Sequence, residues 1–275
     1  RLLLFMSVSS QGRVRRLVQH NIEHIRSNFS QEVEVFLVHY DKNEDTQKLY
    51  GPWYDEQVQY SAVLSGTFKF QAAQRLLPGH LKEHNYDWIL LADDDVDFTG
   101  MDFGRMVAMA DRTGSLIVQP ALSQANGVRD SIGLRAQRKT YTGCQPGDPL
   151  CSFLSQSPGC LYRYTNYVEV MAPLIRQEAL VKILSDCPDC IHEKSCWGQP
   201  RIWCRWSAKQ QFTPEETVCA VLDETFMEHM NFRTLPKWLQ NEHVQKYDLP
   251  ASNDLQARFP AEYAKGLTSF RCIKK

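Results

Sequence analysis

The sequence predicts a mixed α/β fold, in which a mainly parallel sheet is flanked by helices. One observation behind this is the order strand, helix, strand over residues 2–40, which is typical of parallel sheets with right-handed crossovers. Another is the apolar run from Trp88 to Ala92, whose length and large side chains indicate a buried central strand. A third is that all nine cysteines lie between Cys144 and Cys272. We therefore expect a regular first part and a cysteine-rich, irregular segment after it.

Each element follows from the spacing of apolar residues. Apolar runs predict strands at residues 2–8, 33–40, 58–64, 88–92, 116–118, 167–171 and 218–222. Helical spacing predicts helices at residues 14–29, 68–77, 80–83, 103–111, 174–184 and 254–258. We expect Pro78 to end a helix, Pro120 to break a strand, and residues 41–57 and 123–160 to be loops. The pattern favours one domain over residues 1–236, with a C-terminal extension, residues 237–275, packed on it.

Composition excludes several classes of function. The 275 residues are 43% hydrophobic and 23% charged, which is typical of a globular chain. The net charge of −1 gives no electrostatic case for binding nucleic acid or an anionic membrane. No apolar stretch reaches the roughly 18 residues of a membrane span, so any membrane attachment is expected through an anchor outside this sequence.

The cysteines allow two interpretations. Their spacing within residues 187–204 fits either a zinc site that includes His192 or a cluster of disulfides. Because the other cysteines extend from Cys144 to Cys272, we expect most of the nine to form disulfides, which indicates an oxidising compartment. An N-glycosylation acceptor sequence at residues 28–30 points the same way. Since nine is odd, at least one thiol is expected to be free or to pair between chains.

A cluster of carboxylates follows the central strand. Asp93, Asp94, Asp95 and Asp97 occupy four of five consecutive positions. Like charges this close repel each other, and a hard divalent cation such as Mg²⁺ relieves that repulsion. Ligands of open α/β sheets bind beyond the carboxyl ends of the strands. The sequence therefore predicts a metal site that serves a phosphate-bearing ligand.

Two chemistries fit this cluster. In one, the Asp-x-Asp of residues 93–95 holds a cation on the diphosphate of a nucleotide-sugar and stabilises the leaving group. In the other, Asp95 and Asp97 are the nucleophile and general acid of a haloacid-dehalogenase-type phosphatase. That phosphatase motif normally opens its domain, whereas here about ninety residues precede it. Its position therefore favours the nucleotide-sugar interpretation.

Several blocks together resemble a known family. From Leu2 to about Pro236 the sequence resembles the plant and algal family labelled domain of unknown function 707, which is similar to glycosyltransferases of the GT-A type. The matching blocks are residues 36–41, 68–77, 86–97, 118–122, 168–173, 197–198 and 221–229. The resemblance implies a GT-A-like domain, with a nucleotide-sugar half at residues 1–122 and an acceptor half at residues 123–236.

The resemblance also implies roles on the donor side. The metal, Mn²⁺ or Mg²⁺, would be held by Asp95 and His229, with Asp93 beside it and facing the ribose or sugar. Contacts to the nucleotide-diphosphate sugar would come from Asp93, Asp94, Lys69 and Arg135.

On the acceptor side the sequence departs from the family. The family carries an Asp shortly after its Trp-Gly pair, but here Gln199 and Pro200 follow that pair. Glu169 and Asp223 are the candidate catalytic carboxylates, and Glu193 or Asp189 are open alternatives to Glu169 as the base. The nearby aromatic residues Trp197 and Trp203 are candidates for an acceptor platform, because sugars stack on aromatic faces; packing inside the protein explains them equally well.

These observations favour a metal-dependent glycosyltransferase (EC 2.4) that moves a sugar from a nucleotide-sugar to a glycan or glycoprotein acceptor. We expect it in the Golgi or ER lumen, as a type II membrane protein whose anchor is outside this sequence, or secreted. The alternatives are a phosphatase that uses Asp95 and Asp97, and a catalytically degenerate glycan-binding or scaffold subunit. The lack of an acid after Trp197 and Gly198 is the observation that supports the last alternative.

Overall fold

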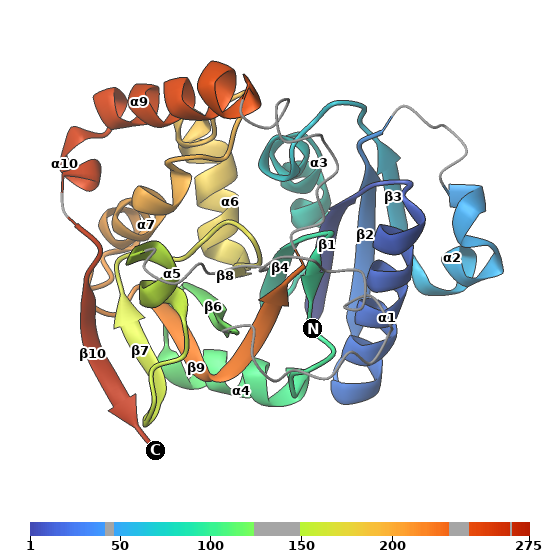
Figure 1. Ribbon diagram of the computed structural model, residues 1–275, viewed down its shortest axis with the longest axis horizontal. Coiled ribbons are helices and arrows are strands. Elements are labelled where there is room, and N and C mark those ends of the chain that lie inside the picture. The colour runs from blue at the N-terminus through green and yellow to red at the C-terminus, as the bar shows by residue number, and fades with distance from the viewer. Residues whose placement is uncertain (42–46, 124–148, 231–241, 265) are drawn as a thin grey trace.

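The computed structural model describes residues 1–41, 47–123, 149–230, 242–264 and 266–275. One sheet runs through this part of the chain, in the order β10-β7-β9-β6-β8-β4-β1-β2-β3, and β5 pairs with β9 off this path (Figure 1). The strands are β1 (Leu2–Val8), β2 (Val33–His39), β3 (Tyr60–Val63), β4 (Trp88–Asp93), β5 (Val96–Asp97), β6 (Ile117–Leu122), β7 (Cys160–Thr165), β8 (Leu174–Arg176), β9 (Cys219–His229) and β10 (Ser269–Lys274). The predicted α/β sheet is confirmed.

The first four strands of the sheet are parallel. β1 pairs in parallel with β2 on one side and with β4 on the other, and β2 pairs in parallel with β3. All seven residues of β1 are buried, as expected for a strand covered on both faces. The chain first moves outward through β2 and β3 and then crosses to the far side of β1 to form β4. The carboxyl ends of β1 and β4 therefore form a topological switch point, where α/β sheets bind ligands.

The other strands form a mixed half. The short strand β8 is antiparallel to both β4 and β6, and β6 is parallel to β9. β7 and β10 then continue the sheet in antiparallel pairs. The C-terminal extension thus contributes β10 to the sheet itself; the expected boundary at residue 236 lies outside the described residues.

Helices cover both faces of the sheet. The α-helices are α1 (Gly12–Asn28), α2 (Pro52–Gln57), α3 (Lys69–Glu83), α4 (Phe103–Thr113), α5 (Pro149–Leu154), α6 (Gln177–Asp186), α7 (Trp203–Gln211), α9 (Leu249–Arg258) and α10 (Pro260–Tyr263). Shorter turns are η1 (Gln47–Tyr50), η3 (Pro188–Cys190), η4 (Gln199–Arg201) and the π-helical turn η5 (Val244–Asp248). None of the described helices is long and apolar enough to cross a membrane.

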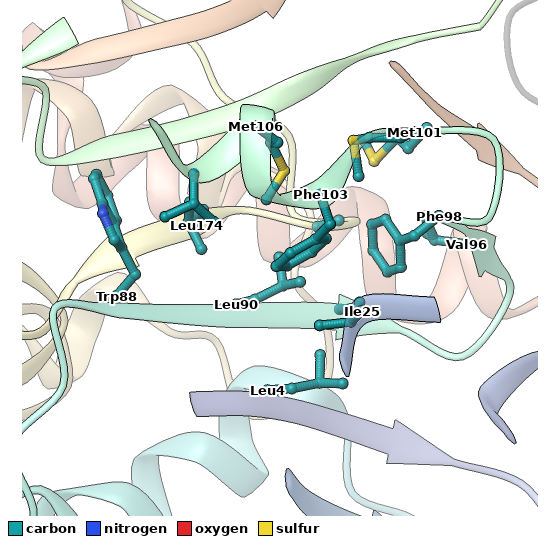
Figure 2. Close-up of a cluster of buried hydrophobic side chains, with 14 of the residues drawn as sticks. Leu4, Ile25, Trp88, Leu90, Val96, Phe98, Met101, Phe103, Met106 and Leu174 are labelled. Carbon is teal, nitrogen blue, oxygen red and sulfur yellow. The ribbon is translucent and has the colours of Figure 1, made fainter. Parts of the chain in front are cut away.

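The core has two layers because alternate strand residues point to opposite faces. Leu4 and Leu90 belong to the cluster that packs against α1 and α4, and Figure 2 shows Leu90 facing Phe103 of α4. Leu3 and Ile89, their neighbours in sequence, belong to the cluster that packs against α3, α6 and α7. Burial on both faces explains why these strands are continuously apolar rather than alternating.

Disulfides tie the later half together. Cys160–Cys272 links β7 to β10, Cys204–Cys219 links α7 to β9, and Cys187–Cys190 closes a short turn. The expectation that most cysteines are oxidised is confirmed, and the zinc interpretation of residues 187–204 is wrong. Cys196 is free among the described cysteines, and burial raises the pKa of its thiol to about 12. Cys144 lies outside the described residues.

The structure corrects several expected boundaries. α3 runs through Pro78 to Glu83, because the tertiary burial of Leu77 and Leu81 offsets the hydrogen bond that proline removes. β6 runs through Pro120, where a register shift against β9 makes room for a residue without an N–H. The loop expected at residues 41–57 contains η1 and α2.

The strand expected at residues 167–171 is absent from the described structure, which has no regular strand there. The segment instead runs irregularly beside β4. The carbonyls of Met171 and Pro173 accept hydrogen bonds from the backbone N–H groups of Asp93 (2.8 Å) and Leu91 (3.0 Å). This brings residues 171–173 directly against the end of the central strand.

Candidate functional site

A cavity of about 480 Å³ opens at the carboxyl ends of the four parallel strands. Its described lining comes from Ser7 in β1, Tyr40 after β2, residues 66–69 after β3, residues 93–95 at the end of β4, and His243 from the C-terminal tail. Ser7 is the register partner of Asp93 across β1 and β4. The cavity therefore lies at the topological switch point that the parallel order creates.

Lys69 joins the two halves beneath this cavity. It is the first residue of α3 and is only 5% exposed. Its Nζ lies 2.6 Å from Asp93 Oδ1 and also donates to the carbonyls of Val170 and Met171. An ammonium group has three hydrogens, and these three acceptors use all of them. Lys69 thus fixes Asp93 against the 170–171 backbone, and its predicted contact with a donor phosphate stays a prediction.

Asp94 is held by the front half of the chain. Its Oδ2 accepts hydrogen bonds from the Ser9 backbone N–H (2.9 Å) and from the Tyr40 hydroxyl (3.1 Å). Burial, and next the charge of Asp95, raise the pKa of Asp94 to about 8. Burial also raises the pKa of Asp93, although Lys69 opposes that shift. The carboxylates are thus crowded in a site that disfavours their combined negative charge.

Asp95 and His229 approach each other from opposite halves of the chain. Asp95 lies in the turn between β4 and β5, and β5 pairs with the end of β9, where His229 is the last residue. His229 Nε2 lies 3.3 Å from Asp95 Oδ2. Burial lowers the pKa of His229. The carboxylates of Asp95 and Asp93 together raise it by more than burial lowers it, so the net shift is upward. Positive charge is therefore favoured between these side chains.

The donor set suits a hard divalent cation. The described residues contain no group of three or more His, Cys, Asp or Glu side chains arranged to hold a metal ion. Mg²⁺-type sites, however, commonly use one or two carboxylates and take their remaining ligands from phosphate and water. Asp95 supplies a carboxylate oxygen and His229 an imidazole nitrogen, which also suits Mn²⁺. The Ser7 hydroxyl lining the same cavity is 7% exposed and has no partner among the described residues, as expected of a group that serves a ligand.

Glu169 lies close to this cluster but is held by its own segment. The Tyr167 hydroxyl donates to Glu169 Oε2 (2.7 Å), and the Val170 N–H donates to Oε1 (2.9 Å). Burial raises the pKa of Glu169, and the charges of Asp93 and Lys69 act on it more weakly. The structure thus places Glu169 near the expected metal ligands, outside the described lining of the cavity.

Two expected site residues are elsewhere in the fold. Asp223 is inaccessible, its side chain being 0% exposed, and its carboxylate pairs with Arg163 (3.2 Å) and accepts from the Ser157 N–H (2.8 Å). Trp203 is also fully buried and packs edge-on against Phe70. The expectations that Asp223 is catalytic and that Trp203 stacks on an acceptor are therefore corrected: both stabilise the interior.

The other expectations have mixed outcomes. Trp197 is 48% exposed, so its predicted acceptor role stays a prediction. Arg135 lies outside the described residues. Asp97 is buried in β5 and accepts from both the backbone N–H and the hydroxyl of Thr99, so it does not join Asp95 in the cavity. This arrangement disfavours the phosphatase interpretation.

Sequence reasoning gave no role to Ser7 or His243, which both line the cavity. Ser7 had a weak signal, since it lies one residue before the end of the first strand, near the edge where ligands bind. His243 had none, because it follows the predicted domain and belongs to no motif.

The family model described as "Protein of unknown function (DUF707)" matches residues 3–269. The chain belongs to this family. The match continues about thirty residues past Pro236 and includes most of the tail, so the family pattern covers His243 as well as the Asp cluster. No curated protein matches the sequence.

Solved structures resemble the chain at low identity. A mycobacterial protein is 11% identical, with a TM-score of 0.50 over 99% of this chain and 83% of its own. A mannosyltransferase from Pyrobaculum calidifontis in complex with GDP-Man and Mn²⁺ is 13% identical and has a TM-score of 0.47. The match covers 97% of this chain and 76% of the mannosyltransferase chain. S. aureus TarS 1-349 in complex with UDP is 10% identical and has a TM-score of 0.47. The match covers 97% of this chain and 72% of the TarS chain. Likeness at these identities concerns the fold and not the activity.

Proposed function

We propose that this protein is a glycosyltransferase that binds a nucleotide-diphosphate sugar together with Mn²⁺ or Mg²⁺ and transfers the sugar to a hydroxyl of a glycan or glycoprotein. The observation that carries the proposal is the cavity at the switch point between β1 and β4, where Asp93, Asp94 and Asp95 meet His229 and the orphaned hydroxyl of Ser7. A site crowded with carboxylates and open to phosphate oxygens suits a ligand that arrives with a divalent cation.

The residues divide the work of binding. Asp95 and His229 would hold the cation, which when bound supplies Lewis-acid stabilisation of the leaving diphosphate. Asp93 is fixed by Lys69 and by the backbone of Met171, and its carboxylate would face the sugar from that fixed position. Asp94 fixes Tyr40 and the turn after β1, and thereby shapes the wall of the cavity.

The acceptor would approach over the later half of the chain. Glu169 lies beside the cluster, its elevated pKa suits proton transfer, and exposed Trp197 offers an aromatic face to a sugar. The disulfides support a site of action in the Golgi or ER lumen or outside the cell, because such bonds persist in oxidising compartments.

The first experiment measures binding of UDP, GDP, CDP and ADP by titration calorimetry, with and without Mn²⁺ or Mg²⁺. We expect one of these nucleotides to bind in a metal-dependent way, and Asp95→Ala to weaken that binding by about a hundredfold. Asp87→Ala is the matched control, because Asp87 precedes the same strand at the opposite edge of the sheet. Metal-independent binding, or equal binding by Asp95→Ala, would overturn the proposal.

A second experiment separates transfer from its alternatives. The nucleotide-sugar of the base that binds is incubated with glycan acceptors, and products are followed by mass spectrometry. Transfer that depends on acceptor supports the proposal, whereas tight nucleotide binding without turnover supports a scaffold subunit. Glu169→Gln and Trp197→Ala test the acceptor wall: if both folded variants keep the transfer rate and the acceptor KM, that wall lies elsewhere.

A further inference from the structure

We propose that His243 of the C-terminal tail, aligned by Asp248 and Ser195, is a residue that contacts the ligand's diphosphate, the role that the family resemblance implies for Lys69. The inference rests on the proposed function for the identity of the ligand, and it assigns a binding residue to a segment that carries no recognised motif.

The charge on the cavity wall leads to this residue. Among the described residues that line the cavity, only Lys69 and His243 can carry positive charge, against three aspartates. The three hydrogens of the Lys69 ammonium already meet Asp93 and two backbone carbonyls. Lys69, itself 5% exposed, would have to break one of these part-buried interactions to reach a phosphate, and leaving its acceptor unpaired is unfavourable. His243 is therefore the remaining described lining residue whose side chain can bring positive charge to an anionic ligand.

The orientation of His243 is built by two further side chains. His243 Nδ1 lies 3.3 Å from Asp248 Oδ2, and the Ser195 hydroxyl donates to Asp248 Oδ1 at 2.5 Å. An ionised carboxylate only accepts hydrogen bonds, so the Nδ1 nitrogen carries the proton. Asp248 and Ser195 are themselves buried, so this support does not depend on exposed side chains. Such carboxylate–imidazole pairs orient a ring toward the group that it binds.

The other ring nitrogen, Nε2, is left for a ligand. It has no hydrogen-bond partner among the described residues, while the ring packs edge-on against Phe68 at the start of α3, with centroids 5.6 Å apart. When the ring is protonated, Nε2 can donate a hydrogen bond to a phosphate oxygen.

The wall beside His243 suits the same ligand. α3 begins here with no side-chain cap on its first turn, and the helix N-terminus carries partial positive charge. The unpartnered Ser7 hydroxyl faces the same cavity from β1. His243, Ser7 and the start of α3 thus present hydrogen-bond donors to one space.

The test measures the affinity of UDP, GDP, CDP and ADP with Mn²⁺ for wild type and for His243→Ala. Because His243→Ala removes a hydrogen bond to a charged phosphate, we expect its Kd to be larger than that of wild type by about tenfold to hundredfold. His243→Gln keeps a neutral N–H donor and should recover part of that loss. Asp248→Asn should weaken binding less than His243→Ala while the Tm of the folded protein is retained. His20→Ala, on the exposed face of α1, is the matched control and should bind as wild type does.

The outcomes separate the two proposals. If wild type binds none of the four nucleotides, the proposed function fails. If wild type binds one of them and His243→Ala binds it within twofold, the assignment of His243 fails and the function stands. If His243→Ala does not fold, NMR of the wild-type protein with ¹⁵N-labelled histidine tests the assignment instead. The Nε2 signal of His243 should shift on adding that nucleotide, and an unmoved signal overturns the assignment.

Discussion

The two halves of the sheet are stabilised in different ways. The parallel half, β1 to β4, contains no cysteine and is held by strands buried on both faces. The mixed half, β6 to β10, carries all three described disulfides and an edge strand contributed by the tail. The parallel half supplies the carboxylates of the cavity, whereas the later chain supplies His229 and His243.

The difference shows how the site is divided. A regular parallel sheet gathers strand-end side chains at one edge without further support. His229 and His243 lie at positions that the spacing of apolar residues does not predict. Disulfides link the neighbouring strands β7 and β10 to each other and β9 to α7 within the mixed half. Perturbing the two halves should therefore give separable effects on stability.

The largest effect is expected from removing the link between β7 and β10. Cys160 and Cys272 are 112 residues apart, and closing a loop of that length stabilises a protein by about 5 kcal/mol in the chain-entropy model. Replacing both cysteines with alanine should lower the free energy of unfolding by that order, measured in urea.

The control is the pair Cys187 and Cys190, only three residues apart, whose removal should lower the free energy of unfolding by about 2 kcal/mol. Equal effects of the two removals would show that loop closure does not stabilise the mixed half. Hydrogen exchange should show lost protection in β10 and little change in β1.

A cavity in the parallel half should have the next largest effect. Leu90 of β4 is fully buried and faces Phe103 of α4, so Leu90→Ala should lower the free energy of unfolding by about 2–5 kcal/mol. Leu249→Ala, at an exposed position in α9, should change it by less than about 0.5 kcal/mol. If reduction of the disulfides produces the same loss in the parallel half as Leu90→Ala does, the halves do not differ as described.

The parallel half was also the more predictable from sequence. β1, β2 and β4 were expected within one residue of their observed ends, because strands buried on both faces leave a continuous apolar signal. The Asp cluster was recognisable because it directly follows such a strand. β7 was missed, since Cys160 to Thr165 mixes polar and aromatic residues and follows a long Ser- and Gly-rich stretch.

The roles of single side chains were harder to predict because they depend on distant partners. Lys69 looked available for a phosphate, but its carbonyl acceptors at residues 170 and 171 lie about a hundred positions away. Asp223 looked catalytic until β7 placed Arg163 beside it. No pattern within ten residues of either side chain contains this information.

Lys69 is also where the two halves meet, and its removal should have an intermediate effect. Lys69→Met keeps the buried stem but removes the donors to Asp93 and to the two carbonyls. Leaving these partly buried acceptors unpaired should lower the free energy of unfolding by about 1–3 kcal/mol, measured in urea. Lys182→Met, at a less buried helix position, is the control, and an equal effect of the two changes would show that Lys69 does not join the halves.

The smallest effect is a pH dependence that belongs to the parallel half. His39 ends β2, is fully buried, and its Nε2 lies 2.7 Å from the Tyr54 hydroxyl. Burial lowers the pKa of His39 below its ordinary value of 6.5, and the Asp41 carboxylate only partly opposes this. Below about pH 6.5, His39 binds a proton in the unfolded chain but stays neutral in the folded protein until the pH falls to its lowered pKa. Stability from neutral His39 is thus complete above about pH 6.5 and decreases as the pH falls, by at most about 1.4 kcal/mol per pH unit.

A variant without this titration isolates the contribution. His39→Gln keeps an amide that can bond to Tyr54 but binds no proton, so the stability difference between wild type and variant should narrow from pH 7.5 to pH 5.5. His20→Gln, at an exposed position of α1, is the control and should keep a constant difference over the same range. A constant difference for His39→Gln would mean that the folded protein protonates this ring as readily as the unfolded chain does. The end of β2 would then open to water in the folded state, and the burial of His39 would not lower its pKa.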